Sequence, residues 1–425
     1  MTKRLYLHIG APKSGTTYLQ AILEGNAAAL AERGVLVVAA HQRLRRVHAA
    51  MAIREDSRLA KLPPEAAAAW DLLVAEIKSW SGDTAICSYE LFAAASAEKA
   101  QKALAKLDGI EVHVVITARD LARAMPSAWQ ERLKFALTEP LVTFAPDRTM
   151  GARAQWGWRT MDPAGVAQRW GASLPAEQVH IVTMSRRPTS KHEFWDRFAS
   201  ACQIDSAGLN LDQERVNESM GVVEAELLRR VNETLAGRIE NNRDQSLLLR
   251  DLFAHQVLVP QGNEPIAISD EQYDEATQRA DEAITQLQES GVSIHGDLED
   301  IRATRVSGRT PDQVSDPELL EVALESIAQL LLRIRAERAE SVPTTGGGSL
   351  PRRMVRALSA PAVESRRRRL ENRLAELEEH TQQRRLLEQR VADLADLVTV
   401  LLQPVAKGTG TVSEEALEEY RRDSL

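Results

Sequence analysis

Short apolar runs alternate with amphipathic segments over the N-terminal part of the chain. The runs, each too short for a helix, cover 5–9, 34–38, 84–87, 112–117 and 179–184. Between several of them, apolar residues recur three and four positions apart, which is the spacing of one buried helix face. Alternating strands and helices predict parallel βαβ units. The pattern therefore predicts an α/β fold with three α/β/α layers, a central parallel sheet and helical additions.

A loop with one lysine and two glycines, GAPKSGTT, joins the first predicted strand to the first predicted helix. Gly10 and Gly15 let the backbone turn and approach a ligand, and the first turn of the helix favours negative charge. In the P-loop pattern G-x-x-x-x-G-K-[ST], Thr17 matches the last position, but Thr16 stands where the lysine belongs. The lysine is Lys13, three residues earlier, which argues against a nucleoside triphosphate bound with magnesium.

GAPKSGTT resembles the 5′-phosphosulfate loop of the sulfotransferases that use 3′-phosphoadenosine 5′-phosphosulfate (PAPS) as donor. The resemblance implies a P-loop fold in which Lys13 lies near the oxygen that bridges phosphate and sulfonate. It also implies that the 5′-phosphate is held by the backbone N–H and hydroxyl groups of Ser14, Gly15, Thr16 and Thr17. No metal ion is implied.

A second motif follows the fourth predicted strand, where Arg119 is succeeded eight positions later by Ser127. An arginine and a serine at this separation resemble the pair that holds the 3′-phosphate in the same sulfotransferases. Arginine offers a bidentate fork to phosphate, and serine offers a short donor. A purely structural explanation is equally good: the arginine would cap a strand end, and the serine would open a helix after Pro126.

Transfer to an acceptor also requires a base near the acceptor oxygen. Glu90 is our choice, because it follows the third predicted strand at the edge of the sheet where ligands bind. Sulfotransferases resembling this chain use either Glu or His, so His48 and His8 are rivals. His48 belongs to the polar stretch 41–62, which we expect to form a lid. For Glu90, a structural ion pair is as good an explanation as a catalytic role.

The predicted function is transfer of a sulfonate group from PAPS to a hydroxyl or amine. The acceptor is left open, since a sugar, a phenol, a lipid headgroup or a peptide tyrosine would each suit the aromatic and arginine-rich segments. One alternative is a P-loop kinase or ATPase, although TAICSYE offers magnesium only Ser88 and Glu90. Another is a non-catalytic scaffold that acts through its C-terminal coiled coil and keeps a vestigial nucleotide site.

Composition adds the expected setting of the protein. The chain has 425 residues, 44% of them hydrophobic, and a net charge of −8 with no conspicuous basic patch, so nucleic acid is not an expected partner. Cys87 and Cys202 are its only cysteines, which fits a reducing compartment. No apolar run reaches the length of a membrane span. We therefore expect a cytoplasmic protein.

The C-terminal part reads as a separate element. Leucine and valine at heptad-like spacing predict a coiled coil and a homo-oligomer. For the four successive arginines Arg366–Arg369, we weigh contact with an anionic membrane or polyanion against a solvated helix face. The expected organisation is a PAPS-binding domain over 1–300, a helical extension over 301–340, a flexible linker over 341–351, the coiled coil over 352–405 and a disordered tail over 406–425.

Overall fold

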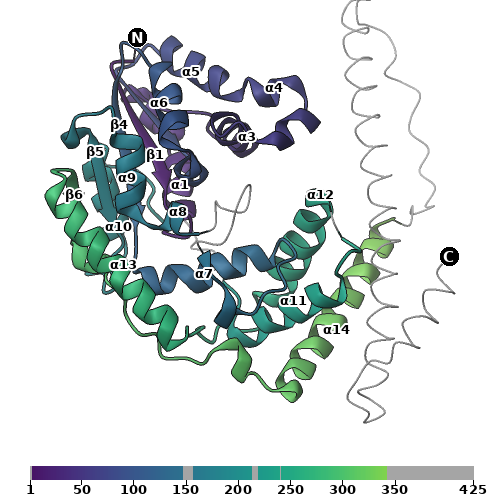
Figure 1. Ribbon diagram of the computed structural model, residues 1–425. Helices are drawn as coiled ribbons and strands as arrows, with labels where there is room; N and C mark the ends of the chain where they lie inside the picture. The colour runs from purple at the N-terminus through teal and green to yellow at the C-terminus, as the bar shows by residue number, and fades with distance from the viewer. Residues whose placement is uncertain (1, 147–156, 213–218, 240, 342–425) are drawn as a thin grey trace, which may run out of the picture. The chain divides into compact units, whose positions relative to one another are not determined.

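Figure 1 shows the protein as a computed structural model, which describes residues 2–146, 157–212, 219–239 and 241–341. The first of two compact units covers Met1–Val322, and it contains the sheet and the residues of the site described below. The predicted coiled coil and tail lie outside the described residues, as does the predicted linker beyond residue 341.

Six strands form one sheet within the described residues, in the order β2-β3-β1-β4-β5-β6. Every pairing between neighbours is parallel. The predicted α/β fold with a central parallel sheet is therefore confirmed. In chain order the strands are β1 (Arg4–Gly10), β2 (Val35–Val37), β3 (Thr84–Ser88), β4 (Glu111–Ala118), β5 (Val179–Thr183) and β6 (Ser293–His295).

The central strand β1 is covered by helices on both faces. Its residues Leu5, Leu7 and Ile9 are fully buried, as expected for a strand with neighbours on each side and helices above and below. On one face, α1 (Thr16–Gly25) and α10 (Glu193–Ala201) pack their apolar sides onto the sheet. On β4, the helix α9 (Pro163–Gly171) packs beside α6 (Ala97–Ala105). These layers leave the carboxyl ends of the strands open for a site.

The remaining helices belong to the first unit, except that α14 extends beyond its last residue, Val322 (Figure 1). They are α2 (Ala27–Glu32), α3 (Arg43–Ile53), α4 (Pro64–Ala67), α5 (Ala69–Ser79), α7 (Leu121–Leu133), α8 (Trp158–Met161), α11 (Val222–Thr234), α12 (Asn242–Asp244), α13 (Asp270–Glu289) and α14 (Asp316–Ser341). Short 3-10 turns connect them, among them η1 (Ser57–Lys61) and η2 (Glu90–Ala94). No helix in the described ranges is both long and apolar enough to cross a membrane.

Two segments differ from the sequence prediction. The stretch 41–62, expected to form a lid, contains the helix α3, which packs against α5. The helix buries Ala49, Ala50 and Ile53, and the arginines before and after them made the segment look polar in the sequence. The segment 243–253, whose sequence pattern is helical, contains the π-helix η7 (Gln245–Leu258) in place of a regular α-helix. Both segments border the site described next.

Candidate active site

The loop GAPKSGTT leaves the end of β1 with two glycines in backbone conformations that other residues rarely adopt. Gly10 has a φ of 109°, and a Cβ atom there would lie 2.8 Å from the carbonyl oxygen of Glu90. Gly15 has a φ of 80°, and a Cβ atom there would clash with Met184 and Phe194. Both positions therefore require glycine, and Gly15 directly precedes the first turn of α1.

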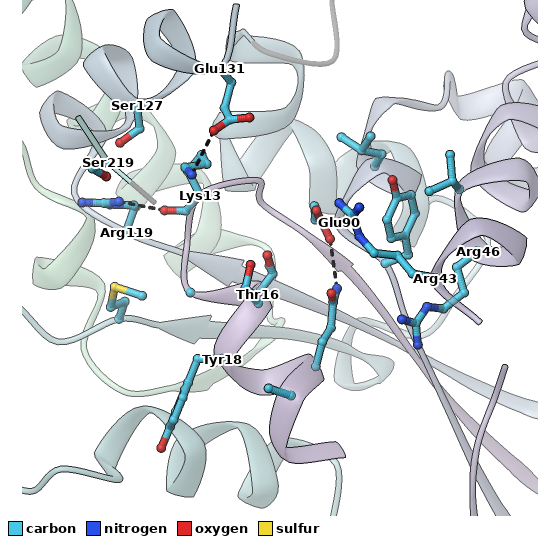
Figure 2. Close-up of a pocket in the computed structure, with 18 of the residues that line it drawn as sticks. Lys13, Thr16, Tyr18, Arg43, Arg46, Glu90, Arg119, Ser127, Glu131 and Ser219 are labelled. Atoms are coloured by element: carbon cyan, nitrogen blue, oxygen red, sulfur yellow. Dashed lines mark hydrogen bonds and ion pairs between the residues drawn. The ribbon is translucent and has the colours of Figure 1, made fainter. Parts of the chain in front are cut away.

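A cleft of about 1010 Å³ opens at the carboxyl ends of the strands, around the N-terminus of α1. Figure 2 shows side chains that line it, with Lys13 beside Glu131 and Arg119 in the upper left part of the view. Of the predicted site residues, the cleft brings together Lys13, Gly15, Thr16, Thr17, Glu90, Arg119 and Ser127. Residues distant in the sequence therefore meet in one place, as the order of parallel strands predicts.

Lys13 is held by a buried carboxylate on α7. Its Nζ lies 3.1 Å from Oε1 of Glu131, and the same oxygen lies 2.7 Å from Nζ of the fully buried Lys134. Burial by itself would raise the pKa of Glu131, but the two ammonium groups outweigh it and lower that pKa to about 2. Glu131 therefore stays ionised and fixes Lys13, whose backbone also has a left-handed φ of 62°.

Arg119 follows β4 and braces the loop. Its Nη1 donates a 2.7 Å hydrogen bond to the carbonyl oxygen of Lys13. Burial lowers the pKa of Arg119 to about 10, so the guanidinium remains charged at neutral pH. Ser127 and Ser219 lie on the same side of the cleft as Arg119 (Figure 2). This side of the cleft therefore presents a cation and two hydroxyl groups.

Ser127 lies inside α7 rather than at its start. The helix is capped by Asp120, whose side chain accepts hydrogen bonds from the N–H groups of Ala122 and Arg123. Pro126 therefore lies in the interior of the helix, and the interpretation of Ser127 as a helix-opening residue is wrong. The helix places Ser127 and Glu131 four residues apart, one turn from each other on the side that lines the cleft.

Ser14 differs from the other loop residues. Its hydroxyl donates to the carbonyl oxygen of Ala11 and lies 2.6 Å from Oγ1 of Thr117. The side chain is fully buried and is not among the groups that line the cleft. Its hydroxyl thus stabilises the loop on the side away from the cleft, while Thr16 and Thr17 line the cleft.

The three candidate bases have different surroundings. Glu90 lines the cleft, and its Oε2 accepts a 2.9 Å hydrogen bond from Nε2 of Gln20. His48 lies on α3, and it is absent from the cleft lining although four other residues of that helix contribute to it. His8 is fully buried in β1, with its Nδ1 2.7 Å from Oγ of Ser88. Glu90 is therefore the one of the three that borders the cleft.

The π-helix η7 adds cleft residues that the sequence reasoning missed: Ser246, Arg250, Asp251 and His255. In a π-helix, with about 4.4 residues per turn, these positions share one side. In an α-helix, at about 100° per residue, His255 would lie opposite Ser246. The signal in the sequence is the spacing of the buried residues Leu249, Ala254 and Leu258, which follow each other by five and four positions.

Comparison with known proteins adds little to this geometry. No curated protein matches the chain by sequence. Residues 370–424 match a family described as a domain of unknown function, DUF6752, in the part that the structure does not describe. Among solved structures, the fold is similar to a sulfotransferase domain from the curacin biosynthetic pathway, over 65% of this chain and 97% of that chain, with 11% identity and a TM-score of 0.32.

The buried His8 predicts a dependence of stability on pH. Burial lowers the pKa of His8 to about 3, whereas an unfolded chain protonates histidine near pH 6.5. Between these values the unfolded state binds more protons, so the free energy of unfolding falls by about 1.4 kcal/mol per pH unit as the pH decreases through that window. Urea unfolding between pH 7 and pH 5 is expected to show a loss about 2 kcal/mol larger for the wild type than for His8→Gln.

His180, whose pKa is lowered to about 4 by burial, makes the same kind of contribution in both proteins and cancels in this comparison. Equal losses in the two proteins would show that His8 is not neutral in the folded state.

Proposed function

We propose that the protein transfers a sulfonate group from PAPS to a hydroxyl or amine of an acceptor. The observation that carries the proposal is the common cleft of Lys13, Arg119 and Ser127. Lysine displaced from the triphosphate position and an Arg–Ser pair on the same cleft suit a nucleotide with phosphate groups at both the 5′ and 3′ positions.

The residues of the cleft fit such a donor. The N-terminus of α1 with Thr16 and Thr17 offers N–H and hydroxyl donors for the 5′-phosphate. Arg119 and Ser127 would bind the 3′-phosphate, and Lys13 would neutralise charge that develops on the leaving oxygen. The 1010 Å³ of the cleft leaves room for an acceptor beside the nucleotide.

Bound PAPS supplies the sulfonate: a bond forms from sulfur to the acceptor oxygen or nitrogen as the sulfur bond to the 5′-phosphate oxygen breaks, and adenosine 3′,5′-bisphosphate (PAP) leaves. Lys13 stabilises the electron pair left on that phosphate oxygen. Glu90, which borders the cleft, takes the proton that the acceptor loses. The amide of Gln20 orients the Glu90 carboxylate.

Thermal unfolding tests the proposal. PAP in EDTA, at about one hundred times its dissociation constant, is expected to raise the melting temperature by about 5 °C. ATP with magnesium is expected to give a smaller shift, because it lacks the 3′-phosphate that Arg119 and Ser127 would bind. A shift with ATP and magnesium but none with PAP would favour a kinase or ATPase. No shift with either nucleotide would favour the scaffold.

A further inference from the structure

Four arginines line another side of the same cleft. Arg43 and Arg46 belong to α3, Arg54 is the C-cap residue of that helix, and Arg58 lies in η1. Figure 2 shows Glu90 between the loop lysine and the two arginines of α3. We call these four residues the arginine subsite, and it lies apart from the residues that suit the donor nucleotide.

Among the residues that the structure describes, fewer carboxylates than cations take part in the ion pairs of this subsite. Glu24 forms an ion pair with Arg46. Asp56 is shared, because its Oδ2 lies 2.6 Å from Nη2 of Arg58 and 3.5 Å from Nη2 of Arg54. Among the described residues, these two carboxylates therefore serve three guanidinium groups.

Two guanidinium groups retain donors for a ligand. Arg43 is exposed and makes no hydrogen bond or ion pair with any residue that the structure describes. Arg46 is only 2% exposed, and its Nε is buried without a hydrogen-bond partner. A buried donor left unpaired costs stability, and an oxyanion that draws the Nε of Arg46 toward the cleft would remove that cost.

Three of these arginines influence the pKa of the same side chain, Tyr89. Tyr89 lines the cleft directly before Glu90, and burial raises the pKa of its phenol. Arg43, Arg54 and Arg46 each act in the opposite direction, so all three cations are close enough to influence one hydroxyl group. Their like charges raise the energy of the subsite, and an anion bound among them would lower it.

We infer that the acceptor carries an oxyanion, a carboxylate or a phosphate ester, that binds the arginine subsite while its hydroxyl faces Glu90. Guanidinium groups bind such planar or forked oxyanions through pairs of hydrogen bonds. The inference rests on the proposed function and narrows the acceptor to an acidic alcohol or phenol.

Matched probes test the inference on the full chain saturated with PAP, which keeps anions out of the donor site. Calorimetric titration compares glucose with glucuronate and with glucose 6-phosphate, and 4-hydroxybenzamide with 4-hydroxybenzoate. At least one acid is expected to bind about tenfold or more tightly than its neutral partner. Preference for glucuronate or 4-hydroxybenzoate identifies a carboxylate, and preference for glucose 6-phosphate identifies a phosphate ester.

The variant Arg43→Met is expected to reduce the affinity for the preferred acid about tenfold and to leave the neutral partner within twofold. Arg43→Lys keeps the charge and is expected to restore part of the loss. Arg45→Met is the matched control, because Arg45 lies on the same helix two positions after Arg43 but pairs with Glu76, 2.9 Å away, outside the cleft lining. It is expected to bind every probe as the wild type does.

Two results would overturn the inference: no acid binding more tightly than its neutral partner, or a preference for the acid that survives in Arg43→Met. Either result with PAP still raising the melting temperature removes the acidic acceptor and keeps the proposed function. Absence of any effect of PAP removes the proposed function itself.

Discussion

Lys13→Met is expected to lower the turnover number for sulfonate transfer by about 10²- to 10³-fold. Methionine keeps the length of the side chain but cannot stabilise charge on the leaving phosphate oxygen. The loop should keep its shape, because its backbone is held by Arg119 through a 2.7 Å hydrogen bond and by the buried hydroxyl of Ser14. The measurement is the rate of PAP formation at saturating donor and acceptor, together with PAP affinity from calorimetry.

Lys13→Arg is the companion variant, since it keeps the positive charge within the reach of Glu131. It is expected to retain more activity than Lys13→Met. A turnover number for Lys13→Met within a few-fold of the wild type, with unchanged PAP affinity, would remove Lys13 from the reaction.

Arg119→Met is expected to weaken binding of PAP by about 10- to 100-fold, because a charged hydrogen-bond donor to the 3′-phosphate is lost. Binding of adenosine 5′-phosphate, which has no 3′-phosphate, is expected to weaken much less. The comparison matters because Arg119 also holds the carbonyl oxygen of Lys13. If only that contact mattered, Arg119→Met would weaken binding of both nucleotides to the same degree.

Arg123→Met is the matched control for Arg119→Met. Arg123 is an exposed arginine in the first turn of α7 and does not belong to the cleft lining. Its replacement is expected to leave both affinities unchanged. An equal loss for PAP and adenosine 5′-phosphate in Arg119→Met would contradict the assignment of Arg119 to the 3′-phosphate and leave it as a residue that braces the loop.

The strand–loop–helix unit at the N-terminus was predictable because its determinants are local. Apolar residues at 5–9 specify a buried strand, and β1 covers Arg4–Gly10. The helix predicted to follow the loop is α1, which begins at Thr16. Gly10 and Gly15 stand at two of the positions where the loop has a positive φ, and Lys13 is a third. Neighbours along the chain decide each of these features.

Secondary structure was harder to predict where charged or irregular patterns mask the buried face. In α3 the buried apolar residues Ala49, Ala50 and Ile53 stand among several arginines, so the sequence pattern was interpreted as a lid. In η7 the buried residues follow the period of a π-helix, and an α-helical template places Asp251 and His255 on the wrong side. Both errors concern segments that line the cleft.

The sequence by itself determined the parallel α/β fold, the glycine-containing loop between β1 and α1 and the strand ends at which Glu90 and Arg119 lie, since these follow from local periodicity and from the order of strands. Only the tertiary structure decided that Glu131 holds Lys13, 118 positions away, and that Arg119 braces the loop, 106 positions away. It also decided that the hydroxyl of Ser14 turns inward and that His48 lies outside the cleft lining. Contacts of this kind depend on how layers pack against each other, and no local pattern of residues specifies them.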